Sequence, residues 1–340
     1  MKSTWSKIIV SLLIAVIFAG ATFAGYLYYH RYHPYVKALS LKLEDNHYYD
    51  CTVTTTDARY LTTFADPDSN SPHVDFFALG DVGTGEEMQR SVAEQMAEHA
   101  QKDPISFILF LGDNFYPSGV SSTTDDQWES KFEAIYDQPS LQVPFYAVLG
   151  NHDYVLNPKA QIDYTKISPR WQMPNNYYDR IIEVDSGVEL HLFGIDANMY
   201  HSNRTAFNEQ MDWLDNRLDS SGAAWKLVYG HHPIHSGGTH GDSPFLIEHL
   251  KPILLKHDVD VYVSGHDHNL QLLKPTGNLH YVVSGAGGKD IYSINWDERM
   301  IFGHAGHGFA KFTAYKHFLQ MDFINHVGKT AFSYTIRKVG

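Results

Sequence analysis

Several apolar runs in this chain end at a glycine that is followed at once by a side chain able to bind a metal ion. In chain order these side chains are Asp81, Asp113, Asn151, His152, His231, His266 and His268. Taken alone, each one is more simply a turn or helix-capping residue. Because the same arrangement occurs after five separate runs, we expect these side chains to form one metal site.

The chain has a single cysteine, Cys51, and this limits which atoms can bind a metal at such a site. It excludes an intramolecular disulfide and thiolate zinc sites, so oxygen and nitrogen atoms must hold any metal. Tyr116 lies three residues after Asp113, and a turn of helix there would place both side chains on one face. His266 and His268 are one residue apart, so they would point the same way in an extended segment.

Strands and helices alternate from residue 73 onward, and these elements must position the metal-binding side chains. The expected strands lie within residues 73–81, 105–114, 144–153, 188–196, 224–233, 259–268 and 279–287. The expected helices lie within residues 86–101, 128–137, 208–218 and 243–258. This alternation predicts a parallel sheet in an α/β layered domain, with the functional crevice at the carboxyl ends of the strands.

Two further patterns bear on the fold. In the first expected helix, Met88, Val92 and Met96 would lie on one face. Residues 309–339 alternate polar and apolar side chains without helical spacing, which predicts antiparallel strands that close the fold. The chain has 340 residues, 43% of them hydrophobic, and a net charge of −13. This composition predicts a globular body and argues against nucleic-acid binding as the main role, because such proteins usually carry a basic surface.

The N-terminus has the pattern of an export signal. Lys2 and Lys7 precede an uncharged apolar stretch at residues 8–29. It is either a signal peptide cleaved near residues 19–21 or a membrane anchor long enough to span a bilayer. Both alternatives place the body outside the cytoplasm. The predicted parts are therefore a signal anchor or signal peptide (residues 1–35), a lead-in or linker (36–72) and the domain expected to carry the metal site (73–340).

The stretches "GDNFYPSGV", "GNHDY", "AQIDYTKISPRW", "GHDHNLQ" and "YVVSGAG" carry a family resemblance. The chain resembles the metallophosphoesterases and, within them, the purple acid phosphatases of the small tartrate-resistant type. The likeness runs from about residue 74 to residue 288. It implies an α/β fold, namely a layered α/β/β/α sandwich with mixed sheets and helices on the outside.

The resemblance also implies two metal ions. One would be held by Asp81, Asp113, Tyr116 and His268. The other would be held by Asp113, Asn151, His231 and His266, so that Asp113 bridges the pair. Two carboxylates and a phenolate suit Fe(III) in the first set, whereas an amide and two imidazoles beside the shared carboxylate suit Fe(II), Zn(II) or Mn(II) in the second.

The resemblance implies that the protein is an acid phosphatase. It would hydrolyse phosphate monoesters by attack of a metal-bound hydroxide. His152, and His240 nine residues after His231, would contact the phosphate and the leaving group. The expected partners are small phosphate esters, with the membrane as a further partner if the N-terminal segment is retained, and the expected state is a monomer. Two alternatives stay open: a phosphodiesterase, nucleotidase or pyrophosphatase on the same scaffold, and a non-catalytic, membrane-tethered binding protein.

Overall fold

The structure is a computed structural model that describes residues 51–54 and 71–337. The predicted signal or anchor segment lies outside these residues, as does nearly all of the predicted linker. In the described ranges, no helix combines the length and the apolar character needed to cross a bilayer.

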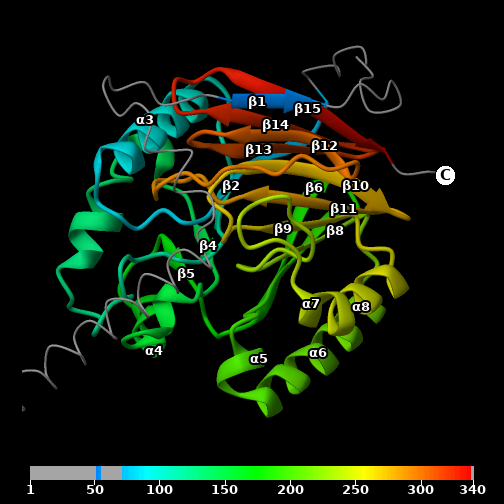
Figure 1. The fold of residues 1–340 in the computed structure, drawn as a ribbon, viewed down its shortest axis with the longest axis horizontal. Coiled ribbons are helices and arrows are strands. Elements are labelled where there is room, and N and C mark those ends of the chain that lie inside the picture. Colours follow the sequence, from blue (N-terminus) through cyan, green and yellow to red (C-terminus); the bar gives the residue numbers. More distant parts are fainter. Residues whose placement is uncertain (1–50, 55–70, 338–340) are drawn as a thin grey trace, which may run out of the picture. The chain divides into compact units, whose positions relative to one another are not determined.

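The described strands form two mixed sheets (Figure 1). The larger sheet contains, in spatial order, β1 (Cys51–Thr54), β12 (Met300–Ala305), β10 (Leu270–Thr276), β11 (Leu279–Ser284), β9 (Val261–Ser264), β8 (Trp225–Tyr229), β7 (Val188–Gly194) and β6 (Tyr178–Asp185). The smaller contains β15 (Thr330–Arg337), β14 (Phe318–Asn325), β13 (Gly308–Tyr315), β2 (His73–Leu79), β3 (Phe107–Phe110), β4 (Phe145–Ala147) and β5 (Trp171–Gln172).

The helices lie on the outer faces of the sheets. They are α3 (Glu87–Lys102), α4 (Pro158–Tyr164), α5 (Met199–Ser202), α6 (Arg204–Asp219), α7 (Pro244–His249) and α8 (Lys251–Lys256), with shorter turns at Glu129–Glu133, Pro139–Leu141 and His152–Tyr154. In Figure 1, α3 lies at one side of the fold, and α6, α7 and α8 gather together at the other.

Three apolar cores hold these layers together. Residues such as Phe76 and Leu227 meet between the two sheets. The neighbouring Phe77 points the opposite way and packs in a second core with Val92 of α3. A third core joins the larger sheet to α6, α7 and α8. Because both faces of the central strands are buried, these strands are rich in apolar residues on both faces, as in FILF of β3. The result is the α/β/β/α sandwich that the family resemblance implies.

The strand directions also agree with the prediction. The strands β2, β3, β4 and β5 pair in parallel, as do β7, β8, β9 and β11. The tail strands β13, β14 and β15 pair antiparallel, and β13 joins the smaller sheet beside β2. The carboxyl ends of both parallel groups therefore provide the rim on which the predicted metal-binding residues lie.

The buried face of α3 differs at one position from the apolar face seen in the sequence. Met88 lies partly exposed, and Gln89 takes the buried position beside Val92 and Met96. The Gln89 amide is satisfied there because it accepts a hydrogen bond from the Gly85 N–H and donates to the Lys131 carbonyl oxygen.

Two of the expected helices differ in form. The expected helix within residues 128–137 is a π-helical turn at Glu129–Glu133. The expected helix within residues 243–258 is two short helices, α7 and α8, that meet at Leu250. A proline in the first turn of α8 favours a new helix start at that point.

Candidate metal centre

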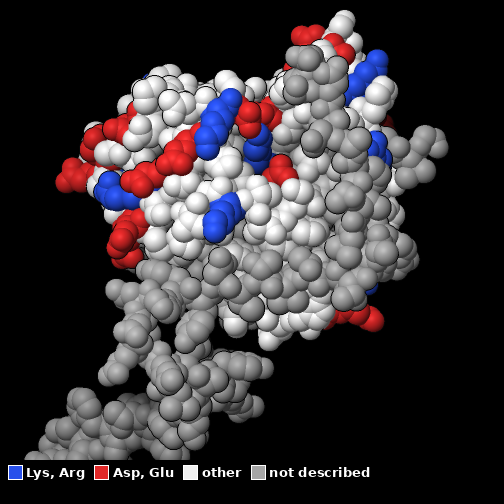
Figure 2. Space-filling model, turned by 90° about the horizontal axis from the view of Figure 1, so that it is seen from above, with Lys and Arg blue, Asp and Glu red and all other residues white. Residues whose placement is uncertain are grey.

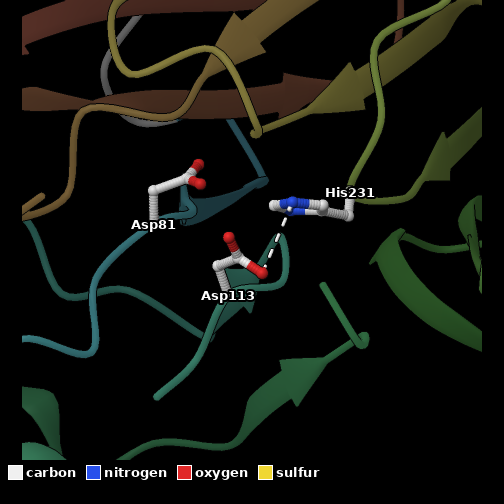
Figure 3. Close-up of side chains that lie close together, drawn as sticks. All are labelled: Asp81, Asp113 and His231. Carbon is white, nitrogen blue, oxygen red and sulfur yellow. Dashed lines mark ion pairs between the residues drawn. The ribbon is translucent and has the colours of Figure 1, made fainter. Parts of the chain in front are cut away.

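The predicted metal-binding side chains converge where the carboxyl ends of the two sheets meet. Asp81 and Asp113 follow β2 and β3 of the smaller sheet, and His231 follows β8 of the larger sheet. Figure 3 shows these three side chains pointing toward a common space. All three are buried, and each offers one ligand atom within 4.8 Å of the others. Residues more than a hundred positions apart are therefore placed in one centre.

One half of the centre is built around the Tyr116 hydroxyl. This oxygen lies 3.0 Å from Asp81 Oδ1, 2.9 Å from Asp113 Oδ2 and 3.1 Å from His268 Nε2. His268 Nε2 lies 3.4 Å from Asp81 Oδ1. Four predicted ligands thus face one point, and we call this group the tyrosine half.

The second half is built around His231 Nε2. This nitrogen lies 3.0 Å from Asn151 Oδ1, 3.1 Å from His266 Nδ1 and 3.5 Å from Asp113 Oδ1. We call this group the histidine half. Asp113 offers Oδ2 to the tyrosine half and Oδ1 to the histidine half, which is the placement a bridging carboxylate requires.

The donor atoms fit two metal ions in spacing and in chemistry. Metal–nitrogen and metal–oxygen bonds of about 2.0–2.2 Å place neighbouring donor atoms about 3 Å apart, close to the separations in both halves. The tyrosine half offers carboxylate and phenol oxygens with one imidazole, which suits a hard ion. The histidine half offers two imidazoles and an amide beside the shared carboxylate, which suits a borderline divalent ion.

Backbone carbonyl groups orient two of the imidazoles. His231 Nδ1 lies 2.9 Å from the Leu111 carbonyl oxygen, and His268 Nδ1 lies 2.7 Å from that of Asp290. Such contacts fix the tautomer, because Nδ1 must donate its proton and Nε2 is left as an electron-pair donor toward the centre. Both rings are therefore oriented toward the centre by the fold itself.

Three predicted ligands have left-handed backbone conformations. The φ angles are 59° at Asp81, 51° at Asp113 and 68° at His266. Residues other than glycine take this conformation uncommonly, although Asp and His do so more often than most, and it costs free energy that the surrounding structure must offset. The His266–His268 segment is therefore a tight bend, and the expectation of an extended segment there was wrong.

The glycines before the ligands permit very close packing. A Cβ atom on Gly150 would lie 2.1 Å from Asp113 Oδ1, and one on Gly112 would lie 2.8 Å from His231 Nδ1. Gly112 also has a φ of 87°, which glycine adopts without strain. These two positions explain why the strands end on glycine directly beside the predicted ligands.

The charges of the tyrosine half depend on one another. Burial raises the pKa of Tyr116, and the charges of Asp81 and Asp113 raise it further. Burial would also raise the pKa of Asp81, but the charge and hydrogen bond of His268 reverse this and lower it. Without added positive charge, the phenol therefore keeps its proton between two carboxylates.

In the histidine half, the pKa values of the two imidazoles shift in opposite directions. Burial lowers the pKa of His266 well below its usual value, and the charge of His231 lowers it further. Burial acts the same way on His231, but the charges of Asp113 and Asp81 outweigh it and raise the pKa. The His266 ring is consequently neutral and available as a ligand.

His152 and His240 lie at the mouth of the centre, with side chains 39% and 40% exposed. His152 donates its backbone N–H to Asp113 Oδ1 (2.8 Å), and its Nδ1 lies 2.6 Å from the Pro117 carbonyl oxygen. The His240 ring lies 4.0 Å from that of His266. Both imidazoles therefore border the metal-binding side chains and reach solvent.

Two acids that support the centre were missed in the sequence. Asp153 is fully buried and accepts hydrogen bonds from the backbone N–H groups of Gly150 and Asn114. Burial and the charge of Asp113 raise its pKa to about 7. Asp267 is also buried and accepts from Ser236 Oγ and from the backbone N–H of His240. The available signal was an acid inside each His-containing motif, "NHD" and "HDH".

Comparisons with known proteins identify the family of the chain. The family model described as calcineurin-like phosphoesterase matches residues 74–270. Tartrate-resistant acid phosphatase type 5 of Oryctolagus cuniculus is 36% identical over 241 residues, which cover 64% of this chain and 74% of that protein. Purple acid phosphatase 3 of Arabidopsis thaliana is 34% identical over 270 residues, covering 73% and 74% of the two chains.

Solved structures share the fold. The structure of GAP50, the anchor in the inner membrane complex of Plasmodium, matches with a TM-score of 0.73 and 24% identity, covering 79% of this chain and 90% of that one. The purple acid phosphatase PPD1 of yellow lupin matches with a TM-score of 0.63 and 17% identity, covering 79% and 54%. At these identities the structural matches support the architecture alone.

Proposed function

The chain belongs to the calcineurin-like phosphoesterases and is similar to the purple acid phosphatases among them, and from this premise we propose that it hydrolyses phosphate monoesters at a two-metal centre. Its homologues are named acid phosphatases, so the general activity is that of a phosphoric monoester hydrolase. The proposal adds the number of ions, their ligands and the preference for monoesters.

The observation that carries the proposal is the position of Asp113. One of its carboxylate oxygens lies 2.9 Å from the Tyr116 hydroxyl and the other lies 3.5 Å from His231 Nε2. A carboxylate that faces two ligand groups in this way suits a pair of ions, because it can bind both and hold them at a fixed separation.

The two ligand groups suggest which ions are bound. We assign Fe(III) to the tyrosine half and Fe(II), Zn(II) or Mn(II) to the histidine half, from the hardness and charge of the donors. When bound, the two ions neutralise the phosphate charge and lower the pKa of a water molecule enough for it to act as a nucleophile. The protein contributes a largely buried set of ligands bordered by the partly exposed His152 and His240.

His152 and His240 are assigned to the substrate. Both imidazoles border the predicted ligands and are partly exposed, so a phosphate ester at the mouth would meet them first. We assign to them hydrogen bonds to the phosphoryl oxygens and delivery of a proton to the leaving oxygen. His240 Nδ1 lies 3.0 Å from Asp267 Oδ1, which leaves its Nε2 to face the substrate.

The proposal also covers the substrate, the oligomeric state and the location of the protein. We expect small phosphate esters as substrates, a monomeric state and a location outside the cytoplasm, the last from the apolar segment at residues 8–29. Figure 2 shows Asp and Glu side chains gathered along one side of the visible face, with Lys and Arg among them. A mixed surface of this kind differs from the basic surface typical of nucleic-acid binding.

The test is metal analysis and a visible absorption spectrum of the purified protein, followed by assays from pH 4 to 8. We expect two ions per chain, a charge-transfer band from a tyrosine–iron contact, and faster hydrolysis of p-nitrophenyl phosphate than of bis-p-nitrophenyl phosphate. A preference for the diester would contradict the monoester assignment and favour a phosphodiesterase. One ion per chain in the fully active protein would contradict the two-metal centre.

A non-catalytic binding role would give a different result. A protein that has lost catalysis usually lacks at least one ligand, whereas all seven predicted ligands are present here. If the protein binds both ions but hydrolyses no phosphate ester at any pH, the binding role becomes the better interpretation.

A further inference from the structure

His240, the imidazole assigned to the leaving group, lies on a loop that wraps around one buried carboxylate. We call residues 235–242 the His240 loop. Asp267 Oδ1 accepts a hydrogen bond from the His240 backbone N–H (2.9 Å) and lies 3.0 Å from His240 Nδ1. Asp267 Oδ2 accepts from Ser236 Oγ, which in turn accepts from the Gly238 N–H (2.8 Å). The position of His240 therefore depends on the path of the whole loop.

Asp242 ties the end of the His240 loop to its beginning. Its Oδ1 accepts a hydrogen bond from the Ser236 backbone N–H (3.1 Å), and its Oδ2 lies 3.0 Å from His235 Nδ1. The other ring nitrogen of His235 lies 3.0 Å from Lys251 Nζ. Because an ammonium group can only donate, His235 Nε2 is the acceptor, and Nδ1 carries the proton that Asp242 accepts. One carboxylate thus closes the loop two residues after His240.

The segment that precedes β12 holds the loop from outside. Arg299 lies directly before this strand, and its Nη1 donates to Asp242 Oδ2 (2.7 Å). Its Nη2 donates to Asp297 Oδ2 (2.7 Å), which fixes the orientation of the guanidinium group. The Asn295 backbone N–H donates to the Gly237 carbonyl oxygen (2.7 Å). The loop is therefore held at two points by a segment that lies far away in the sequence.

The ion pair between Asp242 and Arg299 is placed to set geometry more than to add stability. Its side chains are 32% and 40% exposed, and ion pairs in contact with water contribute little to stability. The His240 side chain is 40% exposed as well. Asp267 contacts only the Nδ1 atom of this ring, so the direction of Nε2 depends on the loop backbone. The pair fixes that backbone close to His240.

We propose that Asp242 and Arg299 are positioning residues, which hold the His240 loop so that His240 Nε2 meets the leaving-group oxygen of the substrate. The inference rests on the proposed function. Transfer of a proton to a leaving oxygen requires the two heavy atoms to approach within about 3 Å. A displacement of about 1 Å, even one caused far from the reacting atoms, can lower a rate about a hundredfold. Loss of the pair should therefore impair this transfer while the metal ligands stay in place.

The test compares two substrates that differ in their need for that proton. p-Nitrophenolate leaves readily as an anion, whereas the alkoxide of glycerol 2-phosphate does not. In metal-loaded Arg299→Met, we expect kcat to fall about tenfold for glycerol 2-phosphate and less than about twofold for p-nitrophenyl phosphate, with unchanged metal content. Asp242→Ala should give the same pattern. Arg299→Lys should restore most of the loss, because its ammonium group also donates to Asp242. Equal falls for both substrates, or no fall for either, would overturn the proposal.

Two further variants separate positioning from a general effect of losing an ion pair. Arg217→Met removes a comparable pair, in which Arg217 Nη2 donates to Asp179 Oδ2 (2.6 Å) on the edge strand β6. It should leave both kcat values unchanged, and a selective loss here would contradict the positioning role. In His240→Ala, which lacks the imidazole itself, adding Arg299→Met should cause no further selective loss. A full additional loss would show that Arg299 acts through another group.

A structural readout keeps this inference separate from the proposed function. In a crystal structure of metal-loaded Arg299→Met, we expect the His240 ring to move away from the His266 ring, whose centroid lies 4.0 Å away in the wild-type chain. An unmoved ring would exclude the positioning role even in an active phosphatase. A wild-type protein that hydrolyses neither ester contradicts the proposed function, while the position of the ring still decides the inference.

Discussion

The two halves of the metal centre share one carboxylate but differ in the balance of oxygen and nitrogen donors around it. The tyrosine half adds Asp81, Tyr116 and His268, two of which are oxygen acids. The histidine half adds Asn151, His231 and His266, none of which can carry a negative charge at neutral pH. One half therefore needs strong positive charge before its phenol can ionise, whereas the other half is ready for a divalent ion. This difference is the basis of the proposal that the two positions bind different ions.

The halves also differ in their support. In the histidine half, His231 is oriented by Leu111, a residue at the end of a central strand. In the tyrosine half, His268 is oriented by Asp290, which belongs to the later segment at residues 287–292. The first support is part of the sheet edge, and the second is a loop whose sequence can vary without disturbing a strand.

The largest expected effect comes from the residue that both halves share. Asp113→Ala should remove both ions and lower phosphatase activity by about 10³-fold or more, because transition-state charge is no longer neutralised. Metal content per chain and kcat/KM measure this. Asp163→Ala, which removes a surface carboxylate from α4, is the control and should change neither. An Asp113→Ala protein that keeps both ions would show that the carboxylate does not bridge them.

The next effect separates the halves. His266→Ala should lower the metal content to about one ion per chain and keep the visible absorption band, with activity reduced by about 10²-fold. His268→Ala should instead lose the band together with the ion of the tyrosine half. If both variants lose the same ion, the division into two halves is wrong.

Tyr116→Phe tests the phenol alone. We expect the visible band to disappear while activity falls less than about tenfold, since the two carboxylates and His268 remain in that half. The absorption spectrum and kcat measure the two effects in one sample. A band that persists in this variant would assign the colour to another residue.

The smallest effect concerns the loop that supports the tyrosine half. Burial lowers the pKa of His307 to about 4, and its Nε2 lies 3.2 Å from the Lys289 carbonyl oxygen. Between about pH 6.5 and pH 4 the unfolded chain therefore binds a proton that the folded chain does not, so this contribution to stability is lost as the pH falls. The loss is of the order of 2 kcal/mol.

Urea unfolding at pH 4.5 and pH 7 checks this contribution in the wild type and in His307→Gln. The variant should show a smaller difference in the free energy of unfolding between the two pH values. An equal difference in both proteins would mean that other groups cause the acid sensitivity.

The position of the site could be predicted from the sequence because its signals are local. An apolar strand, a glycine and a polar ligand occur within a few residues of one another, as at Gly112 and Asp113. Parallel strands then bring such ends to one rim. The layered fold follows from the same alternation. The role of each residue as a metal ligand came from the family resemblance. These roles stay predictions, although the structure places the residues close together.

The remaining features depend on contacts that are distant in sequence. The strands β1, β5, β6, β10 and β12 were missed, although "SG" before β7 and "TGN" before β11 are hairpin signals for β6 and β10. The partial exposure of β6 hides its alternation. The contacts of Lys289 with the Tyr116 ring and of Tyr292 with the His268 ring could not be predicted from the sequence, because the partners lie far apart along the chain.

The left-handed backbone at Asp81, Asp113 and His266 has a consequence for evolution in the laboratory. Glycine would relax the main chain at each of these positions while deleting a donor atom. A screen that selects only for heat resistance would therefore accumulate such replacements. The variants would lose metal ligands while keeping the fold. Thermostable variants of this protein should therefore be selected for hydrolysis of a phosphate ester as well, so that Asp81, Asp113 and His266 are retained.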